Sequence, residues 1–158
     1  MKHIKPYRSI SEAYSSVRRL HTLYMISDRE DLEKNSFGYN QRPIWTYPIL
    51  SDAVNDYMGR EGGYVYEMQV ECSIATTADL IDFYAPILLP DLNAHEQEIK
   101  ADPKTILELL PQLPNDRSIR DFDAIEVGDG VVMLNPGPGI KIMVKLSTRT
   151  LDRLAGNM

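Results

Sequence analysis

The feature that most constrains the fold is a strict alternation of side chains over residues 64–71, directly after a pair of glycines. One set of alternate positions holds Tyr64, Tyr66, Met68 and Val70, and the other holds Val65, Glu67, Gln69 and Glu71. Because successive side chains of a β-strand point to opposite faces of its sheet, the alternation predicts a half-buried strand. The chain therefore builds at least one β-sheet.

Five further runs predict strands, and the sequence between them predicts turns and helices. The strand-like runs are 23–26, 44–47, 124–127, 131–134 and 140–146. Gly128-Asp129-Gly130 predicts a hairpin between 124–127 and 131–134, and the turn-rich segment 135–139 predicts a second one before 140–146. Helices are expected over 9–20, 28–34, 52–58 with Ser51 as N-cap, 103–110, and from 147 onwards. Early and late strands around helical segments favour an α+β fold over a doubly wound parallel sheet.

The composition fits one ordinary folded domain. The 158 residues, of which 43% are hydrophobic, are expected to form a single domain spanning 1–158. The net charge of −6 disfavours direct nucleic-acid binding, which needs a surplus of Lys and Arg. The lone Cys72 cannot form an internal disulfide, and no run is apolar enough to span a membrane, so a cytoplasmic location is expected.

Several common catalytic and metal-binding motifs are missing. His3, His21 and His95 lie in separate segments without the i, i+4 spacing of a zinc site, so no metal site is predicted. Gly128 and Gly130 lie in a hairpin and lack the third glycine of a dinucleotide-binding fingerprint. No serine stands in the G-x-S-x-G context of a hydrolase nucleophile.

Four short blocks, in one order along the chain, carry a resemblance to a known family. The blocks are Leu23-Tyr24-Met25-Ile26-Ser27 with Asp31-Leu32; Ile44-Trp45-Thr46-Tyr47 with Ser51-Asp52-Ala53 and Tyr57; residues 63–70; and residues 122–125 with 130–136 and Ile140-Lys141. Together they cover roughly half of the chain, and in this order the chain resembles the ADP-ribosyltransferase family, which includes the poly(ADP-ribose) polymerases. The resemblance implies a split, mostly antiparallel sheet with flanking helices and a cleft for NAD.

The resemblance also implies roles for individual residues. Trp45 and Tyr57 would clamp the nicotinamide ring of NAD, with Thr46 and Tyr47 beside them. Tyr24, Met25, Ile26 and Ser27 would line the ribose and carboxamide side. Asp129, with Glu126 as the rival, would be the catalytic acid that stabilises positive charge on the ribose as nicotinamide leaves.

The chain departs from the family pattern at two positions. Met25 stands where the family has His or Arg, and a thioether cannot donate a hydrogen bond to the ribose. The family's glutamate falls on or beside Gly130, which leaves Asp129 and Glu126 as the nearest carboxylates.

Each candidate also has a simpler structural interpretation. Asp129-Gly130 is a common tight-turn pair, and Glu126 alternates with apolar neighbours as an outward, solvated carboxylate does. Trp45 and Tyr57 are equally typical of aromatic residues in the core or at its rim, and Met25 is typical of a methionine packed in the core.

Two functions follow from the resemblance. The first is an NAD-dependent mono-ADP-ribosyltransferase that modifies a protein acceptor, as a phage or mobile-element effector would act against a host component. The alternative is a non-catalytic module of the same fold that inhibits a partner, such as a nucleic-acid-handling complex, with an acidic face. The acids considered for that face are Asp79, Asp82, Asp91, Glu96, Glu98, Asp102 and Glu108. Modification of nucleic-acid bases is a third option, which the absence of a basic stripe disfavours.

Overall fold

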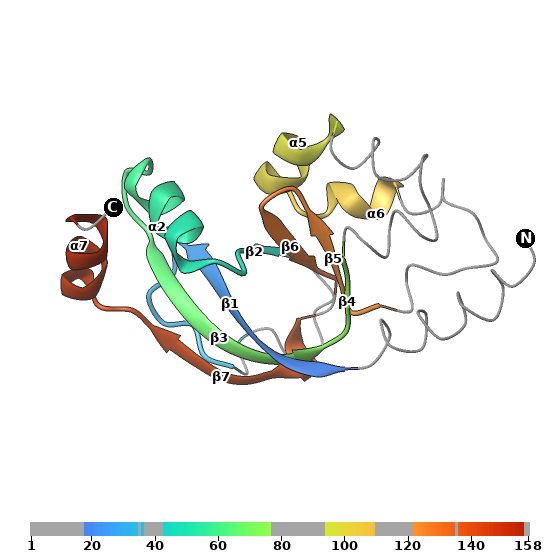
Figure 1. Cartoon of the computed structure of the whole chain (residues 1–158), viewed down its shortest axis with the longest axis horizontal. Helices are drawn as coiled ribbons and strands as arrows, with labels where there is room; N and C mark the ends of the chain where they lie inside the picture. The colour runs from blue at the N-terminus through green and yellow to red at the C-terminus, as the bar shows by residue number, and fades with distance from the viewer. Residues whose placement is uncertain are drawn as a thin grey trace, which may run out of the picture.

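The fold is a mixed α+β arrangement, as the sequence predicts. The computed structural model describes residues 18–34, 36, 43–76, 94–109, 122–134 and 136–156. In these ranges the chain forms two mostly antiparallel β-sheets and four α-helices (Figure 1).

The first sheet has three antiparallel strands in the order β1-β3-β7. Its strands are β1 (Arg19–Ser27), β3 (Tyr64–Cys72) and β7 (Ile140–Lys145). Across it, Met68 stands opposite Leu23 on one side and Met143 on the other. Cross-strand partners share a face of a sheet, and these side chains belong to one apolar cluster. The predicted half-buried strand is therefore the central strand of this sheet.

The second sheet has four strands in the order β2-β6-β5-β4, of which only the β4 and β5 pair is parallel. Its strands are β2 (Ile44–Thr46), β4 (Ile74–Ala75), β5 (Ala124–Val127) and β6 (Gly130–Met133). β5 and β6 form the predicted hairpin, since Val127 pairs with Gly130 and only two residues turn the chain. Gly128 has φ 55° in this turn, a left-handed conformation that glycine adopts at low cost.

The two sheets touch where β1 passes β2. The backbone N–H of Tyr24 donates to the carbonyl of Tyr47 at 2.8 Å, and the N–H of Tyr47 donates back at 2.7 Å. This single bridge lies outside the named strand pairings. The strands therefore follow one another as β4-β5-β6-β2 and then β1-β3-β7, with a split between β2 and β1.

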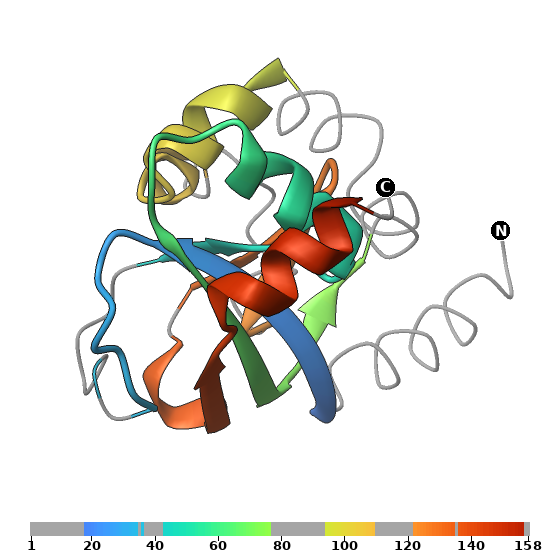
Figure 2. The same ribbon diagram turned by 90° about the vertical axis from the view of Figure 1, so that its left-hand side faces the viewer.

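The helices divide between the two sheets. α2 (Leu50–Met58) and α7 (Thr148–Gly156) pack together near one end of the three-stranded sheet, as Figures 1 and 2 show from two directions. Their buried residues Ala53, Val54 and Leu151 form an apolar cluster with Val65 of β3. On the other side, α5 (Glu96–Ala101) and α6 (Thr105–Leu109) bury Ile99 and Ile106 against the four-stranded sheet.

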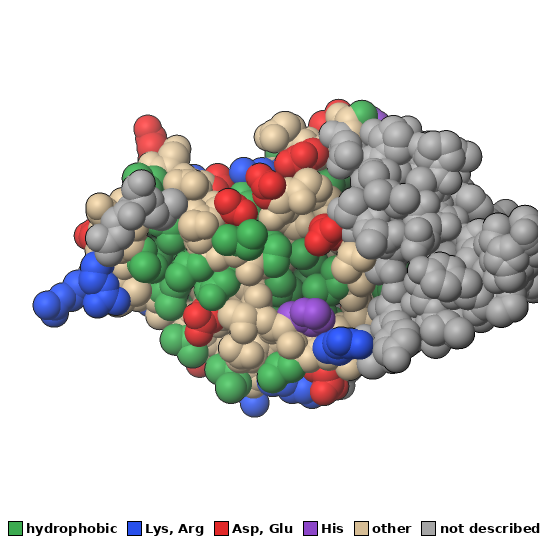
Figure 3. Space-filling view, in the orientation of Figure 1, with side chains coloured by type: hydrophobic (Ala, Val, Ile, Leu, Met, Phe, Trp, Pro, Cys, Tyr) green, Lys and Arg blue, Asp and Glu red, His purple; other side chains and the backbone are tan. Residues whose placement is uncertain are grey.

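A third apolar cluster joins the two sheets. It combines Leu23 and Met68 of the first sheet with Ala124, Val131 and Met133 of the second. At the surface, the described part of the face in Figure 3 shows hydrophobic side chains gathered together, with acidic side chains mainly around them. Since the free energy of burial scales with apolar area, this shared cluster stabilises the packing of the two sheets against each other.

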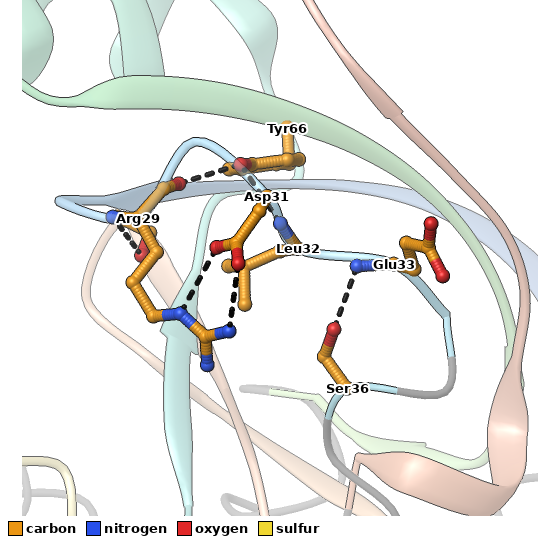
Figure 4. Close-up of polar contacts among 7 residues, drawn as sticks. Arg29, Asp31, Leu32, Glu33, Ser36 and Tyr66 are labelled. Carbon is orange, nitrogen blue, oxygen red and sulfur yellow. Dashed lines mark hydrogen bonds and ion pairs between the residues drawn. The ribbon is translucent and has the colours of Figure 1, made fainter.

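The predicted helix over residues 28–34 is wrong. The Tyr66 hydroxyl of β3 donates to the carbonyl of Arg29 at 2.5 Å and accepts the N–H of Leu32 at 3.3 Å (Figure 4). These backbone groups are therefore bound to a neighbouring strand, and the segment follows β1 as an irregular loop.

Two further expectations about helices need correction. The helix predicted for 9–20 does not include Arg19 and Leu20, which pair with β3 as the start of β1; residues 9–17 lie outside the described ranges. The N-cap of α2 is Ile49, and the predicted cap Ser51 lies within the helix. The first turn of α2 starts earlier because the N–H groups of Asp52 and Ala53 both bond to the carbonyl of Ile49.

The segment 135–139 does not make a hairpin. β6 already pairs with β2 and β5, so it has no free edge for β7. The chain instead crosses to the other sheet through the 3-10 turn η3 (Gly137–Gly139), and β7 pairs with β3.

The remaining predictions for the late part of the chain are confirmed. The three predicted strands form as β5, β6 and β7, the helix predicted after Pro103 forms as α6, and the helix predicted from Ser147 forms as α7. The broken apolar segment 79–89 and most of the predicted loop 35–43 lie outside the described residues.

Candidate functional site

A cavity of about 420 Å³, here called the junction pocket, opens where β1 and β2 meet. It is lined from the end of β1 and the loop after it, from β2, and from α2, α5 and the residues that follow each of those helices. Its apolar and aromatic lining includes Met25, Ile26, Leu32, Ile44, Trp45 and Tyr47. Its charged lining consists, among the described residues, of Arg29, Asp56, Arg60 and Lys100. The pocket thus combines flat rings with an excess of cations.

Five of the ten predicted site residues line the junction pocket. They are Met25, Ile26, Ser27, Trp45 and Tyr47. The remaining five, which the structure does not place in the lining, are Tyr24, Thr46, Tyr57, Glu126 and Asp129. The two early blocks of the sequence therefore converge on one cavity, but neither predicted catalytic acid does.

The aromatic wall is built by alternate residues of one strand segment. Trp45 and Tyr47 are two residues apart, so both side chains point to the same side of β2. Their rings meet edge to face, with centroids 6.0 Å apart and planes at 80°. Trp45 Nε1 is buried and makes no well-formed hydrogen bond. It lies close enough to the Tyr47 hydroxyl to lower the pKa of that hydroxyl. A buried N–H without a well-formed hydrogen bond costs free energy, so this indole nitrogen is a destabilising feature of the aromatic wall.

Tyr57 does not form the predicted clamp with Trp45. It is half-buried on α2, where it packs against the cluster of Ala53, Val54 and Leu151. Tyr47, which directly follows β2, is the ring that stands beside Trp45 instead.

Tyr24 and Thr46 serve the junction of the sheets. Tyr24 contributes its backbone to the bridge with Tyr47, and burial together with nearby Glu67 raises the pKa of its hydroxyl. Thr46 is fully buried, and its hydroxyl donates to the carbonyl of Val131 at 2.7 Å.

Asp56 is the centre of a network at the α2 and α5 end of the pocket. Its Oδ2 accepts the Tyr47 hydroxyl at 3.0 Å and lies 3.9 Å from Arg60 Nε. Its Oδ1 lies 3.5 Å from Lys100 Nζ, which also stands 5.6 Å from the centre of the Tyr47 ring. Two cations thus share one carboxylate.

Burial and charge act on the two titratable groups of this network in different ways. Burial raises the pKa of the Tyr47 hydroxyl above 10.0, and contacts with Lys100 and Trp45 only partly offset this. Burial lowers the pKa of Lys100, but Tyr47 and Asp56 outweigh it and leave that pKa above 10.5. At neutral pH the pocket therefore holds a protonated tyrosine and a charged lysine.

Arg29 belongs to the loop after β1. Its guanidinium bonds to both carboxylate oxygens of Asp31, at 3.2 and 3.4 Å (Figure 4). That hydrogen-bonded pairing with Arg29 lowers the pKa of Asp31. The Ser27 hydroxyl accepts the N–H of Arg29, and Tyr66 holds the loop from the other side. The charge of Arg29 is thus already matched by a carboxylate of its own loop.

Trp45 closes Gly130, the position on or beside which the resemblance would place a catalytic glutamate. A Cβ atom added to Gly130 would lie 2.2 Å from the indole ring, which is far inside contact distance. No side chain can stand at Gly130 while Trp45 keeps this position. Asp129 is exposed in the hairpin turn, and Glu126 is half-buried on β5 opposite Val131.

Cys72 does not supply a nucleophile. Its thiol is buried, and burial, with a contribution from Asp123, raises its pKa to about 12. A thiol needs to ionise before it attacks, so this side chain is inert at neutral pH.

The charged lining was not predicted from the sequence. Asp56 and Arg60 have the i, i+4 spacing of an ion pair at the end of α2, which is the one local signal available. Lys100 comes from α5, far along the chain, and only the tertiary fold brings it to Asp56. Of the acids considered for an inhibitory face, Glu96, Glu98, Asp102 and Glu108 lie on or beside α5 and α6; the other three lie outside the described residues.

Comparisons of the chain with protein-family models, with curated proteins and with solved structures give no match. Within the described ranges, no group of three or more His, Cys, Asp or Glu side chains is arranged to hold a metal ion. None of the helices in the described part of the chain is long and apolar enough to cross a membrane.

Proposed function

We propose that the chain is a nucleotide-binding protein with an ADP-ribosyltransferase-like layout. Its junction pocket would take a ligand of the NAD class, meaning a flat base joined to a diphosphate, and would not transfer ADP-ribose. The observation that carries the proposal is a pocket of aromatic rings and excess cations beside Gly130, where the Trp45 ring leaves no room for a side chain.

The layout supports the family part of the proposal. Two sheets meet at a split between β1 and β2, and the pocket lies at that split. The first block contributes Met25 and Ser27, and the second contributes Trp45 and Tyr47. The late hairpin reaches the same region, because Gly130 lies beneath the Trp45 ring. Residues of these three blocks thus lie in one region of the molecule, which supports the proposal.

The residues present fit a ligand that has both a ring and a diphosphate. The cavity volume of about 420 Å³ falls within the range of about 300 to 1,000 Å³ that is common for small-molecule sites. Trp45 and Tyr47 offer apolar ring surface in the pocket wall. Lys100 and Arg60 together exceed the charge of Asp56 by one, which suits a bound anion.

The same pocket lacks what the transfer step needs. The positive charge that develops on ribose is stabilised by a nearby carboxylate. A carboxylate cannot stand at Gly130, and Asp129 and Glu126 do not line the cavity. Asp56 does line it, but Tyr47, Lys100 and Arg60 already surround that carboxylate. Binding without transfer is therefore the function that this geometry supports best.

Mono-ADP-ribosyl transfer to a protein acceptor is the second candidate. It is favoured by one observation: Asp56 is a carboxylate in the cavity wall. If a bound diphosphate drew Lys100 and Arg60 away, Asp56 would be left with only the Tyr47 hydroxyl as a partner.

One experiment separates these functions. Titration calorimetry with NAD is expected to detect binding, and Trp45→Leu is expected to weaken it, while the matched change Tyr57→Leu outside the pocket leaves it intact. Radiolabelled NAD incubated with the protein and a cell extract is expected to leave no label on protein. Label transfer would favour the second candidate, and absence of any binding would overturn the proposal.

A further inference from the structure

The positive charge of the junction pocket is unequally distributed. Arg29 forms a two-point pair with Asp31 in its own loop. Lys100 and Arg60, in contrast, share the single carboxylate of Asp56 at longer distances of 3.5 and 3.9 Å. The uncompensated positive charge therefore lies at the end of the pocket where α2 and α5 approach each other.

Both aromatic rings of the pocket already have a face covered. The indole of Trp45 lies against the backbone at Gly130, so close that a Cβ atom would not fit between them. One face of the Tyr47 ring carries the ammonium group of Lys100 at 5.6 Å from its centre. A cation over a ring face takes the position that another flat cation would need.

These two facts have opposite consequences for the two ends of NAD. The diphosphate is attracted by Lys100 and Arg60. The nicotinamide ring, which carries a positive charge, is repelled by the same cations and finds the Tyr47 face next to Lys100 already used. ADP-ribose keeps the diphosphate and lacks the cationic ring, so it carries one more net negative charge than NAD.

We infer that the junction pocket selects ADP-ribose over NAD, and that Lys100, with Arg60, is the group that holds the diphosphate. This inference rests on the proposed function, because it concerns the same pocket and names its ligand class. The chain would then recognise ADP-ribose, free or attached to another molecule through the part that leaves the pocket.

Titration calorimetry on the full chain with ADP-ribose and with NAD tests the inference. We expect ADP-ribose to bind about tenfold more tightly than NAD at low salt, with the ratio narrowing as salt screens the charges. Lys100→Met is expected to weaken ADP-ribose binding about tenfold and NAD binding by less, so that the preference shrinks.

Lys145→Met is the matched control. Lys145 also stands over an aromatic ring, 5.1 Å from the centre of Tyr64, and lies 3.8 Å from Glu30, but it does not line the pocket. It should leave both affinities unchanged. Arg60→Met serves as a second variant if Lys100→Met does not fold, as judged by circular dichroism.

The outcomes are distinct. If neither nucleotide binds, the proposed function itself fails. If NAD binds as tightly as ADP-ribose or more tightly, or if Lys100→Met and Arg60→Met leave the preference unchanged, the nucleotide-binding function stands and the inference about ligand class is overturned.

Discussion

The two ends of the junction pocket are built on different physical principles. At the β2 and β6 end, the Trp45 ring lies on Gly130 with no space between them, and Thr46 bonds to the buried carbonyl of Val131. At the α2 and α5 end, Asp56 meets Lys100 and Arg60 at ion-pair distances, with side chains that are partly exposed to solvent. Close packing and a buried hydrogen bond order the first end, and ion pairs order the second. Substitutions at the first should change stability, and those at the second should change binding and its dependence on salt and pH.

The largest effect is expected from Gly130→Ala. The added Cβ would lie 2.2 Å from the Trp45 ring, so the ring or the strand has to move, and overpacking of this kind costs about 2 to 3 kcal/mol. Urea denaturation should show this loss of unfolding free energy. Gly156→Ala is the control, because nothing lies within 4 Å of its added Cβ. Equal stability of the two variants would show that Gly130 is not closed by the indole.

A smaller loss is expected from Thr46→Val at the same end. The change keeps the shape of the side chain and removes the hydroxyl that donates to Val131, which costs about 1 kcal/mol when both groups are buried. Thr22→Val is the comparison: Thr22 is half-buried and accepts a bond from Gln69 on the β1–β3 surface. A loss as large for Thr22 as for Thr46 would contradict the special role of the buried bond.

At the charged end, stability should depend on pH in alkaline solution. The folded-state pKa of Lys100 is raised above 10.5, so its contribution is fully present below that pH and is lost as pH rises through the folded value. The raised pKa of Tyr47 acts in the same direction above pH 10.0. As pH rises from about 9 to 12, the midpoint temperature of thermal unfolding should decrease less steeply for Lys100→Met than for the wild type. Parallel curves for the two proteins would mean that Tyr47 and Asp56 do not raise the pKa of Lys100.

The smallest effect is expected from Asp31→Asn. Both Arg29 and Asp31 are exposed, and such pairs contribute little to stability, so the unfolding midpoint should not move measurably. The change frees the charge of Arg29 and should tighten ADP-ribose binding about twofold in calorimetry. A larger gain than this would place the main anion contact at Arg29 and weaken the assignment to Lys100.

Local patterns in the sequence predicted the elements of the fold better than their arrangement. The alternation over 64–71 and the turn at Gly128-Asp129 depend on neighbouring residues, and both are formed. The pairing of β7 with β3 depends on β6 having no free edge, and the irregular loop at 28–34 depends on the hydroxyl of Tyr66. Neither cause is visible in the segment itself.

The candidate site shows the same division. Met25, Ile26, Ser27, Trp45 and Tyr47 were predicted because they belong to contiguous strand blocks. Lys100 was missed because its partners Asp56 and Tyr47 come from other elements, and no periodicity links them. The closure of Gly130 by the indole is likewise a contact between two strands that are far apart in sequence.

In the inferred complex, Lys100 holds the diphosphate of an ADP-ribose unit in the junction pocket. A crystal structure of the full chain soaked with ADP-ribose would show whether this contact forms. We expect diphosphate oxygens within hydrogen-bond distance of Lys100 Nζ and an unmoved Trp45 ring over Gly130. Density for the nucleotide elsewhere on the surface, or an empty pocket in crystals soaked at saturating ADP-ribose, would contradict it.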